Sequence, residues 1–481
     1  MSDITVELAQ GDLDLRQTSE EILRPVETGP TYRHTVGLII SGLLTLLGAA
    51  CWGRQMYIGM GVSGLMWPVM WAIYITNFVF WVGIAHSGTL ISAILYLFRA
   101  KFRPAFSRAS EAMTIFAVLT AGLFPIIHLG RSWRFYWILP YPNLRHIWPN
   151  MRSPLVLDVF AVSTYLIVSL IFWYLGMLPD LAEIRDRASG WKRTIYGVLS
   201  LGWMGSLRQI SPYLKLYILL AGLATPLVLS VHTTVSWDFA LSLLPGWHEE
   251  IFPPYFVAGA IFSGLAMVLT LVIPMRSWFR LQKHITMEHL DALCRLILLT
   301  SSIVTFSYAT EYFMAWYSSD TYERSAYWMR AFGHYWKPFW MTIAFNCVLP
   351  LLFFWKGIRR SLVAMFILSI FINIGMWLER FVLIVTTLAY SFDPASWGIY
   401  HVQWIEVGIT VGSFGWFMLQ FLSFLKIAPA LPVAEVRRDI LEARRAKRAL
   451  IAAGLLPPPG EHPPSPPEGP AVVPEPAIPV T

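Results

Sequence analysis

Residues 254–275 read PYFVAGAIFSGLAMVLTLVIPM, a run of 22 residues without one charged side chain. A helix of roughly 20 apolar residues crosses the hydrocarbon core of a bilayer, which is about 30 Å thick. The run therefore predicts a membrane-spanning helix. Working outward from it in both directions, we predict ten such spans, at residues 36–57, 68–98, 111–130, 155–178, 212–240, 254–278, 290–316, 337–355, 361–389 and 404–426.

The composition of the whole chain agrees with a membrane protein. Of its 481 residues, 56% are hydrophobic and 14% are charged, and the mean hydropathy is +0.55. Soluble domains carry about 25% charged residues, so the composition excludes an ordinary soluble enzyme. The predicted fold class is an all-α integral membrane protein with about ten transmembrane helices.

The positive charges indicate how the chain is oriented. Of the 36 Lys and Arg residues, 26 fall on the side of the N-terminus, 8 fall on the opposite side, and Arg295 and Arg380 lie within spans. Loops rich in Lys and Arg stay in the cytoplasm, so both termini are predicted to be cytoplasmic. The net charge of +7 then reflects these loops beside membrane lipids and not a nucleic-acid partner.

A short internal repeat predicts how the spans are grouped. Residues 86–88 (His-Ser-Gly) in the second span match residues 262–264 (Phe-Ser-Gly) in the sixth. A basic loop follows each tripeptide, and an acidic residue, Glu111 or Glu288, comes 23 or 24 residues after the glycine. The repeat predicts two four-helix bundles, formed by spans 2–5 and 6–9, with spans 1 and 10 as two peripheral helices.

We divide the chain into a cytoplasmic N-terminal segment (1–35), the first five spans (36–240), the last five spans (254–426) and a cytoplasmic tail (427–481). In the tail, residues 434–453 predict a basic helix near anionic lipid head groups. Residues 457–480 are rich in proline, which predicts an extended segment.

Polar residues of three consecutive spans fall at one predicted depth. His128 ends the third span, Asp158 lies about one turn into the fourth, and Asp238 lies near the outer end of the fifth. Oxidation of a quinol releases two protons, and a carboxylate or imidazole bonded to the quinol hydroxyl can accept one. We predict that these three residues are catalytic in a quinol site, with Asn77 and His232 completing the pocket. The alternative for each residue alone is that it satisfies a helix end or interfacial water.

Further ionisable residues lie in or beside the predicted spans. Placing a charged side chain in hydrocarbon costs roughly 2.5–3.5 kcal/mol on insertion scales, so each charged residue within a span is expected to have a structural or functional role. A proton path would use His86, Glu111, Glu288, Asp291, Arg295, Glu311, Glu379, Arg380 and Glu406. Association of helices by ion pairs and hydrogen bonds explains the same residues equally well, and both interpretations stay open.

The cysteine pattern bears on cofactors. The chain has 3 Cys, far apart and without CxxC spacing, so neither a covalent haem nor an iron–sulfur cluster is predicted in this chain. Haem b needs two facing His residues, and the one plausible pair, His86 with His232, is weak support. No metal site is predicted.

Two predicted outer loops, residues 131–154 and 314–340, are dense in Trp, Tyr and Arg. Aromatic belts explain part of this. Such residues also dominate protein–protein interfaces, so we predict that a periplasmic partner docks there.

Three segments carry a family resemblance. They are FPIIHLGR (124–131), SPLVLDV (153–159) and SVHTTVSWDFA (230–240). With the ten spans they resemble the NrfD/PsrC-like membrane subunits, over residues 30–426. The length and span number are most similar to the ActC type of subunit in alternative complex III.

The resemblance implies a menaquinol-binding and menaquinol-oxidising subunit of a bacterial inner-membrane complex, without a redox centre of its own and inactive in isolation. It implies a pocket of His128, Asp158 and Asp238 near the periplasmic face. The partners it implies are a periplasmic iron–sulfur subunit, multihaem and monohaem cytochrome c subunits, a second NrfD-like subunit and small membrane subunits. Proton translocation is a further function that it suggests.

Two other functions fit ten spans. A secondary transporter would also have a repeat and charges within the membrane, although Pro226, Pro274 and Pro350 do not occupy matched positions in the two halves. The third hypothesis is a purely structural membrane anchor for an oxidoreductase.

Overall fold

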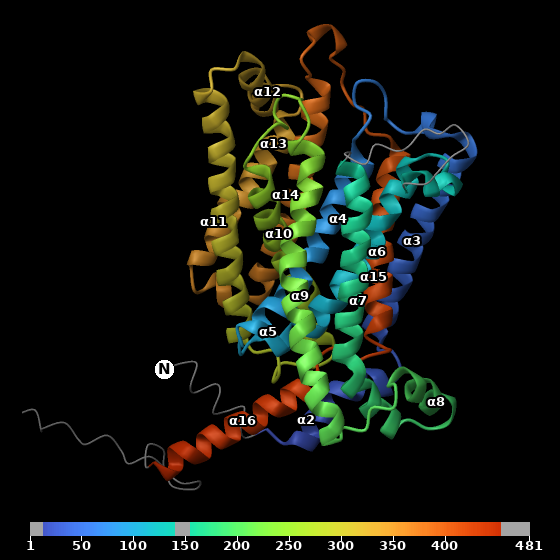
Figure 1. Ribbon diagram of the computed structural model, residues 1–481, viewed down its shortest axis with the longest axis vertical. Coiled ribbons are helices and arrows are strands. Elements are labelled where there is room, and N and C mark those ends of the chain that lie inside the picture. The colour runs from blue at the N-terminus through green and yellow to red at the C-terminus, as the bar shows by residue number, and fades with distance from the viewer. Residues whose placement is uncertain (1–12, 140–153, 454–481) are drawn as a thin grey trace, which may run out of the picture. The chain divides into compact units, whose positions relative to one another are not determined.

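The computed structural model describes residues 13–139 and 154–453 (Figure 1). Within them it confirms the predicted fold class: ten helices are long and apolar enough to cross a membrane. These are α3 (Tyr32–Ile58), α4 with its continuation through α5 (Ile73–Leu97), α6 (Ser107–His128), α7 (Pro154–Arg187), α9 (Leu207–Ala240), α10 (Phe252–Trp278), α11 (Met287–Tyr317), the span that begins with α13 (Trp336–Phe354), α14 (Leu362–Ala389) and α15 (Trp404–Phe424). The shorter helices are α2 (Leu15–Glu27), α8 (Gly190–Leu199), α12 (Thr321–Phe332) and α16 (Val433–Ala452).

Eight of the long helices form two rings of four. In the first bundle α4 packs on α6, α6 on α7, α7 on α9, and α9 on α4. In the second bundle α10 packs on α11 and α14, and the α13 span lies between α11 and α14. We call the end of the bundles that carries His128 and Asp238 the His128 end, and the opposite end, with Arg108, the Arg108 end.

The two bundles meet where α4 crosses α10, at the repeated Ser-Gly pairs. A Cβ atom added to Gly264 would lie 2.2 Å from the Cβ of Ser87, so the Ser87 side chain fills the space that Gly264 leaves. A Cβ atom added to Gly83 would lie 3.7 Å from the Oγ of Ser263. Small residues at a crossing let two membrane helices approach closely, and here they join the two halves of the repeat.

The peripheral helices α3 and α15 pair with each other along one flank of the bundles (Figure 1). The backbones meet at Gly48 and Gly412, where an added Cβ on either glycine would lie within 2.7 Å of the other residue's Cα. Gly408 and Gly412 form a GxxxG motif, a typical contact surface of membrane helices. The pair packs through α15 on α4 and α6 of the first bundle.

Two spans contain a π-helical turn, which their sequence pattern did not indicate. In the second span the turn covers Leu90–Ile94, and the Ser92 carbonyl accepts a hydrogen bond from Nε of Arg103 at 2.7 Å. In the eighth span it covers Ala344–Val348, and the Asn346 carbonyl accepts one from Oγ of Ser301 at 2.8 Å. Carbonyl groups that leave the helical pattern inside a membrane need such partners.

The described parts of the terminal segments, residues 13–19 and 434–453, belong to a unit of their own. Its helix α16 covers the residues for which a basic helix is predicted, and their place near lipid head groups stays a prediction. The Pro-rich residues 457–480 lie outside the described residues.

The α4–α10 crossing gives a direct test of the fold. Gly264→Ala places a methyl group against Ser87, and overpacking of this kind costs about 1–3 kcal/mol. We expect a melting temperature several degrees lower in detergent, measured by scanning fluorimetry. Gly222→Ala is the matched control, because no atom lies within 4 Å of a Cβ at Gly222. Equal melting temperatures for the two variants would contradict the tight crossing.

Candidate functional site

Asp158 and Asp238 lie beside each other at the His128 end of the first bundle. Asp158 is near the start of α7 and Asp238 near the end of α9, and their carboxyl groups are within hydrogen-bonding reach. The exposed fractions are 5% and 9%. Apart from this carboxyl–carboxyl contact, no described residue donates a hydrogen bond to either oxygen of Asp158 or to Oδ1 of Asp238. Two carboxyl groups bond to each other only when one carries a proton, so this pair is suited to holding a shared proton.

His128 closes α6 at the same end and lies edge-on against Tyr74 of α4, with 6.4 Å between the ring centroids. The Tyr74 hydroxyl donates to Oε1 of Gln55 at 2.5 Å, and Nε2 of Gln55 donates to the Ile127 carbonyl at 3.1 Å. The peripheral helix α3 thereby fixes Tyr74 against the imidazole. Nδ1 of His128 is buried and makes no hydrogen bond within the described part of the chain.

Two further histidines lie at the centre of the first bundle. The ring of His86 stacks on Tyr165 at 4.5 Å and contacts His232 at 4.8 Å. Nδ1 of His86 lies 2.6 Å from the Val82 carbonyl, whereas both ring nitrogens of His232 have no partner among the described residues. The two histidine rings are in direct contact, so no haem fits between them in this arrangement. His232 precedes Asp238 by six residues, about 9 Å along the helix.

Asn77, the fifth residue predicted for the pocket, joins helices. Its Nδ2 donates to Oγ1 of Thr410 at 2.8 Å, and its Oδ1 accepts from Nε1 of Trp377 at 2.7 Å. Both polar atoms of the amide are therefore engaged by α15 and α14.

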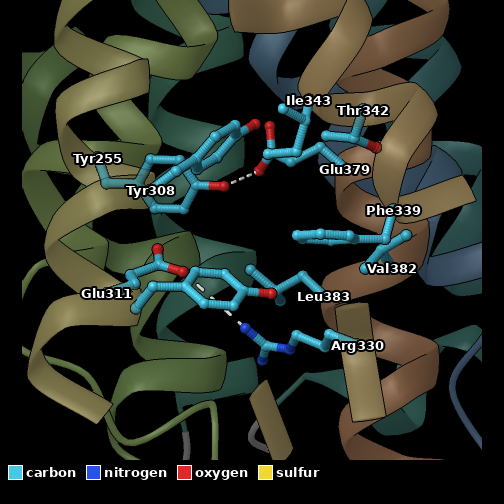
Figure 2. Close-up of a pocket in the computed structure, with 11 residues that line it drawn as sticks. Tyr255, Tyr308, Glu311, Arg330, Phe339, Thr342, Ile343, Glu379, Val382 and Leu383 are labelled. Atoms are coloured by element: carbon cyan, nitrogen blue, oxygen red, sulfur yellow. Dashed lines mark hydrogen bonds and ion pairs between the residues drawn. The ribbon is translucent and has the colours of Figure 1, made fainter. Parts of the chain in front are cut away.

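The second bundle contains a separate cavity of about 40 Å³, lined by ionisable and apolar side chains and large enough for about three water molecules (Figure 2). Figure 2 shows Glu379 near Tyr255 and Tyr308 at one end of the cavity, and Glu311 near Arg330 at the other. Glu379 accepts hydrogen bonds from the Tyr255 hydroxyl and, at 2.7 Å, from the neighbouring Arg380. An ion pair of 3.9 Å joins Glu311 to Arg330.

Helix α12 covers this cavity at the His128 end. Its Arg330 donates to Oγ1 of Thr387 at 2.9 Å and to the Gly246 carbonyl. The Tyr327 hydroxyl lies 3.1 Å from Oε1 of Glu249 and 3.5 Å from Oε2 of Glu311, so it links the cavity to the α9–α10 loop. Burial raises the pKa of Glu249 from its ordinary value.

The remaining ionisable residues lie towards the Arg108 end. Arg108 pairs with Glu111 at 3.1 Å and with Asp180 at 2.6 Å, which joins α6 to α7. Asp291 pairs at 2.6 Å with both Arg295 and Arg359. Arg295 lies within a span, as predicted, but its side chain is 67% exposed, because it turns to the helix surface beside Asp291.

The residues predicted for a proton path therefore do not form one group. Glu111 lies in the Arg108 cluster, and Glu288 and Asp291 lie at the start of α11. His86 lies in the first bundle, whereas Glu311, Glu379 and Arg380 surround or adjoin the cavity of the second. Glu406 begins α15 beside Tyr400 and Tyr74.

The sequence analysis did not single out four buried tyrosines and the arginine of α12 that lies over the cavity. Tyr74, Tyr165, Tyr255, Tyr308 and Arg330 are all buried against predicted site residues. In the sequence the tyrosines do not differ from aromatic-belt residues, and Arg330 lies in a predicted loop. Helical spacing gives the one available signal, because Tyr308 and Glu311 are three residues apart on one face.

The fold and these buried polar groups define a multi-pass membrane protein with ionisable clusters inside its helical bundles. The model of the family "Polysulphide reductase, NrfD" matches residues 61–391, which is more than half of the chain. The chain belongs to this family.

The chain is also similar to two curated proteins. A protein of Halobacterium salinarum, named as a putative membrane subunit of dimethyl sulfoxide reductase, is 29% identical over 255 residues, 52% of this chain and 54% of that protein. A selenate reductase subunit of Mesobacillus selenatarsenatis is 25% identical over 346 residues, 70% of this chain and 78% of that protein. The chain thus spans about half the length of the first relative and more of the second.

The buried ion pair of the second bundle can be tested through stability. Glu311→Ala leaves Arg330 buried without its carboxylate, and removal of one partner of a buried pair costs about 3–5 kcal/mol. We expect a large fall in the melting temperature in detergent. Arg295→Ala is the control, since an exposed pair contributes about 0–1 kcal/mol. Similar small effects of both substitutions would show that the Glu311–Arg330 pair does not hold α12 on the bundle.

Proposed function

We propose that this chain is the quinol-oxidising membrane subunit of an oxidoreductase complex, with the quinol site at the His128 end of the first bundle. The observation that carries the proposal is the buried Asp158–Asp238 carboxyl pair, which has unused acceptor oxygens. It lies at the end of the first bundle where α6 ends with His128. Family membership and the two relatives, both named as subunits of reductases, support a subunit of such a complex.

The chemistry requires two proton acceptors. With one proton between them, Asp158 and Asp238 carry a single negative charge and accept one more proton from a quinol hydroxyl. The buried Nδ1 of His128 accepts the other. The two electrons pass to an acceptor in a partner subunit. His232, which has unused ring nitrogens, would line the deeper part of the pocket, and Asn77 its outer part.

The finer assignment follows the sequence resemblance. We propose that the quinol is menaquinol and that the subunit is of the ActC type in alternative complex III, with both termini in the cytoplasm of a bacterial cell. Electrons would leave through a periplasmic iron–sulfur subunit to multihaem and monohaem cytochrome c subunits. The His128 end then faces the periplasm, and its aromatic surface, including exposed Trp316 and Trp328, would bind the partner.

Asp158→Asn tests the carboxyl pair. The amide cannot accept the quinol proton, so we expect quinol oxidation by the assembled complex to fall roughly 100-fold. The assay is quinol-dependent reduction of the acceptor in membranes, with assembly checked by native gel. An assembled variant with wild-type turnover would remove Asp158 from the mechanism.

The cavity of the second bundle favours an additional role in proton translocation, because Glu379, Glu311 and Arg330 line it. Glu379, the cavity, Glu311, Tyr327 and Glu249 form a nearly continuous series towards the His128 end. Glu379→Gln should leave the affinity for a quinol-site inhibitor unchanged, because Glu379 belongs to the other bundle. It should lower the number of protons moved per quinol, measured with a pH-sensitive dye in proteoliposomes. A large loss of inhibitor affinity would show that the two bundles share one pocket.

A secondary transporter with an internal repeat would have interrupted helices at corresponding positions of its two halves. The π-helical turns lie in spans 2 and 8, whereas the repeat pairs span 2 with span 6 and span 4 with span 8. The turns are therefore not matched, which favours the oxidoreductase subunit. Substrate-dependent flux in liposomes containing the chain alone would support the transporter.

A further inference from the structure

Helix α8 connects the fourth span to the fifth at the Arg108 end and packs against α7 (Figure 1). The backbone turns sharply at both of its ends, where Gly190 and Gly202 have φ angles of +60° and +69°, values that favour glycine. Nε of Arg185 lies beside Asp186, and its Nη1 donates to the Trp203 carbonyl at 2.9 Å, which fixes the second turn on α7. The helix is therefore held in a defined position.

Hydrogen bonds to two spans set the depth of α8 along the bundle. The Tyr174 hydroxyl of α7 donates to the Leu199 carbonyl at 2.6 Å, and the Tyr196 hydroxyl donates to the Ile427 carbonyl at 2.8 Å. Tyr174 lies four residues, about 6 Å, before residue 178, where the apolar stretch of the fourth span is predicted to end. Ile427 follows the end of α15 by three residues. Helix α8 therefore lies at the level where the apolar spans end.

An apolar stripe of α8 is left uncovered by the rest of the chain. Trp191, Ile195 and Val198 are separated by four and three residues, so they share one side of the helix, and they are 71%, 45% and 70% exposed. Three residues of the segment that follows are more than two thirds exposed as well: Leu201, Met204 and Leu207. Exposed apolar surface of this extent is typical of contact with a membrane or with another protein.

Positive charges accompany the stripe. Lys192 and Arg193 follow Trp191 directly, and Arg208 lies in the first turn of α9. All three are exposed, and none of them forms an ion pair with another described residue. Nearby carboxylates are engaged elsewhere, since Glu183 pairs with Arg187 at 2.9 Å. Unpaired cations beside an apolar stripe, at the level of the span ends, match the phosphate groups of a lipid surface better than a protein partner.

We propose that residues 190–208 form an in-plane membrane anchor that binds anionic phospholipids. Trp191, Ile195 and Val198 enter the boundary of the acyl chains, and Lys192, Arg193 and Arg208 bind the phosphate groups of the lipid heads. The Arg108 end is predicted to be cytoplasmic, and the cytoplasmic leaflet is the one that carries anionic lipids. The inference does not depend on quinol oxidation, because the proposed quinol site lies at the opposite end of the first bundle.

Site-directed labelling of the full-length chain in liposomes tests the anchor. The three native cysteines are buried, so a thiol-reactive bimane would label an added cysteine selectively. At Val198→Cys we expect quenching by nitroxide-labelled phospholipids and little quenching by aqueous iodide. Asp186→Cys is the matched control, because Asp186 is exposed on the polar end of α7, where iodide should be the stronger quencher. Equal iodide quenching at both positions, or no quenching by either agent at residue 198, would overturn the anchor.

The lipid charge is tested with the same label at residue 198. The nitroxide is carried either by phosphatidylglycerol or by phosphatidylcholine, and we expect the anionic lipid to quench more strongly. This preference should fall about fivefold for each of the substitutions Lys192→Gln and Arg193→Gln. Arg295→Gln, which removes an exposed cation of the other bundle, should leave it unchanged. Equal quenching by the two lipids with Lys192 and Arg193 in place would overturn the binding of anionic head groups.

Discussion

The organisation of this protein follows from the cost of an unpaired polar group in a region without water. Most charged side chains inside the bundles are paired: Arg108 with Asp180, Arg330 with Glu311, and Arg380 with Glu379. Each pair joins two helices or sits beside a small cavity, and it needs no further explanation. The exceptions are carboxyl and imidazole groups that are buried with polar atoms unused by the described residues. They lie at the end of the first bundle and at its centre, and for this reason we assign the proton chemistry to them.

Close packing at small residues sets the distances between these groups. Ser87 fits against Gly264 where α4 crosses α10, and Gly48 meets Gly412 where α3 pairs with α15. The first contact holds the two bundles together. The second holds the peripheral pair beside the first bundle, where Gln55 of α3 accepts the hydrogen bond of Tyr74, whose ring lies against His128. A peripheral helix pair thus contributes to the site, although the repeat alone would place it outside the functional part of the molecule.

The sequence predicted much of this arrangement because hydropathy and helix length are strong local signals. All ten spans are present, and α7 extends past residue 178 because its continuation to Arg187 is a polar helix outside the apolar stretch. Depth along the spans also led to Asp158 and Asp238, which the fold brings together. Rotation about a helix axis was not available from depth, so the exposure of the Arg295 side chain, on a residue placed within a span, could not be predicted. The π-helical turns depend on partners distant in sequence, Arg103 and Ser301, and no local pattern announces them.

The location of the quinone is the central claim, and covalent labelling tests it most directly. The assembled complex would be irradiated with a photoreactive quinone analogue, with and without excess quinol, and the labelled peptides identified by mass spectrometry. The account predicts displaceable labels in the ends of α6, α7 and α9, around His128, Asp158 and Asp238. Displaceable labels confined to the second bundle, around Tyr308 and Phe339, would contradict it.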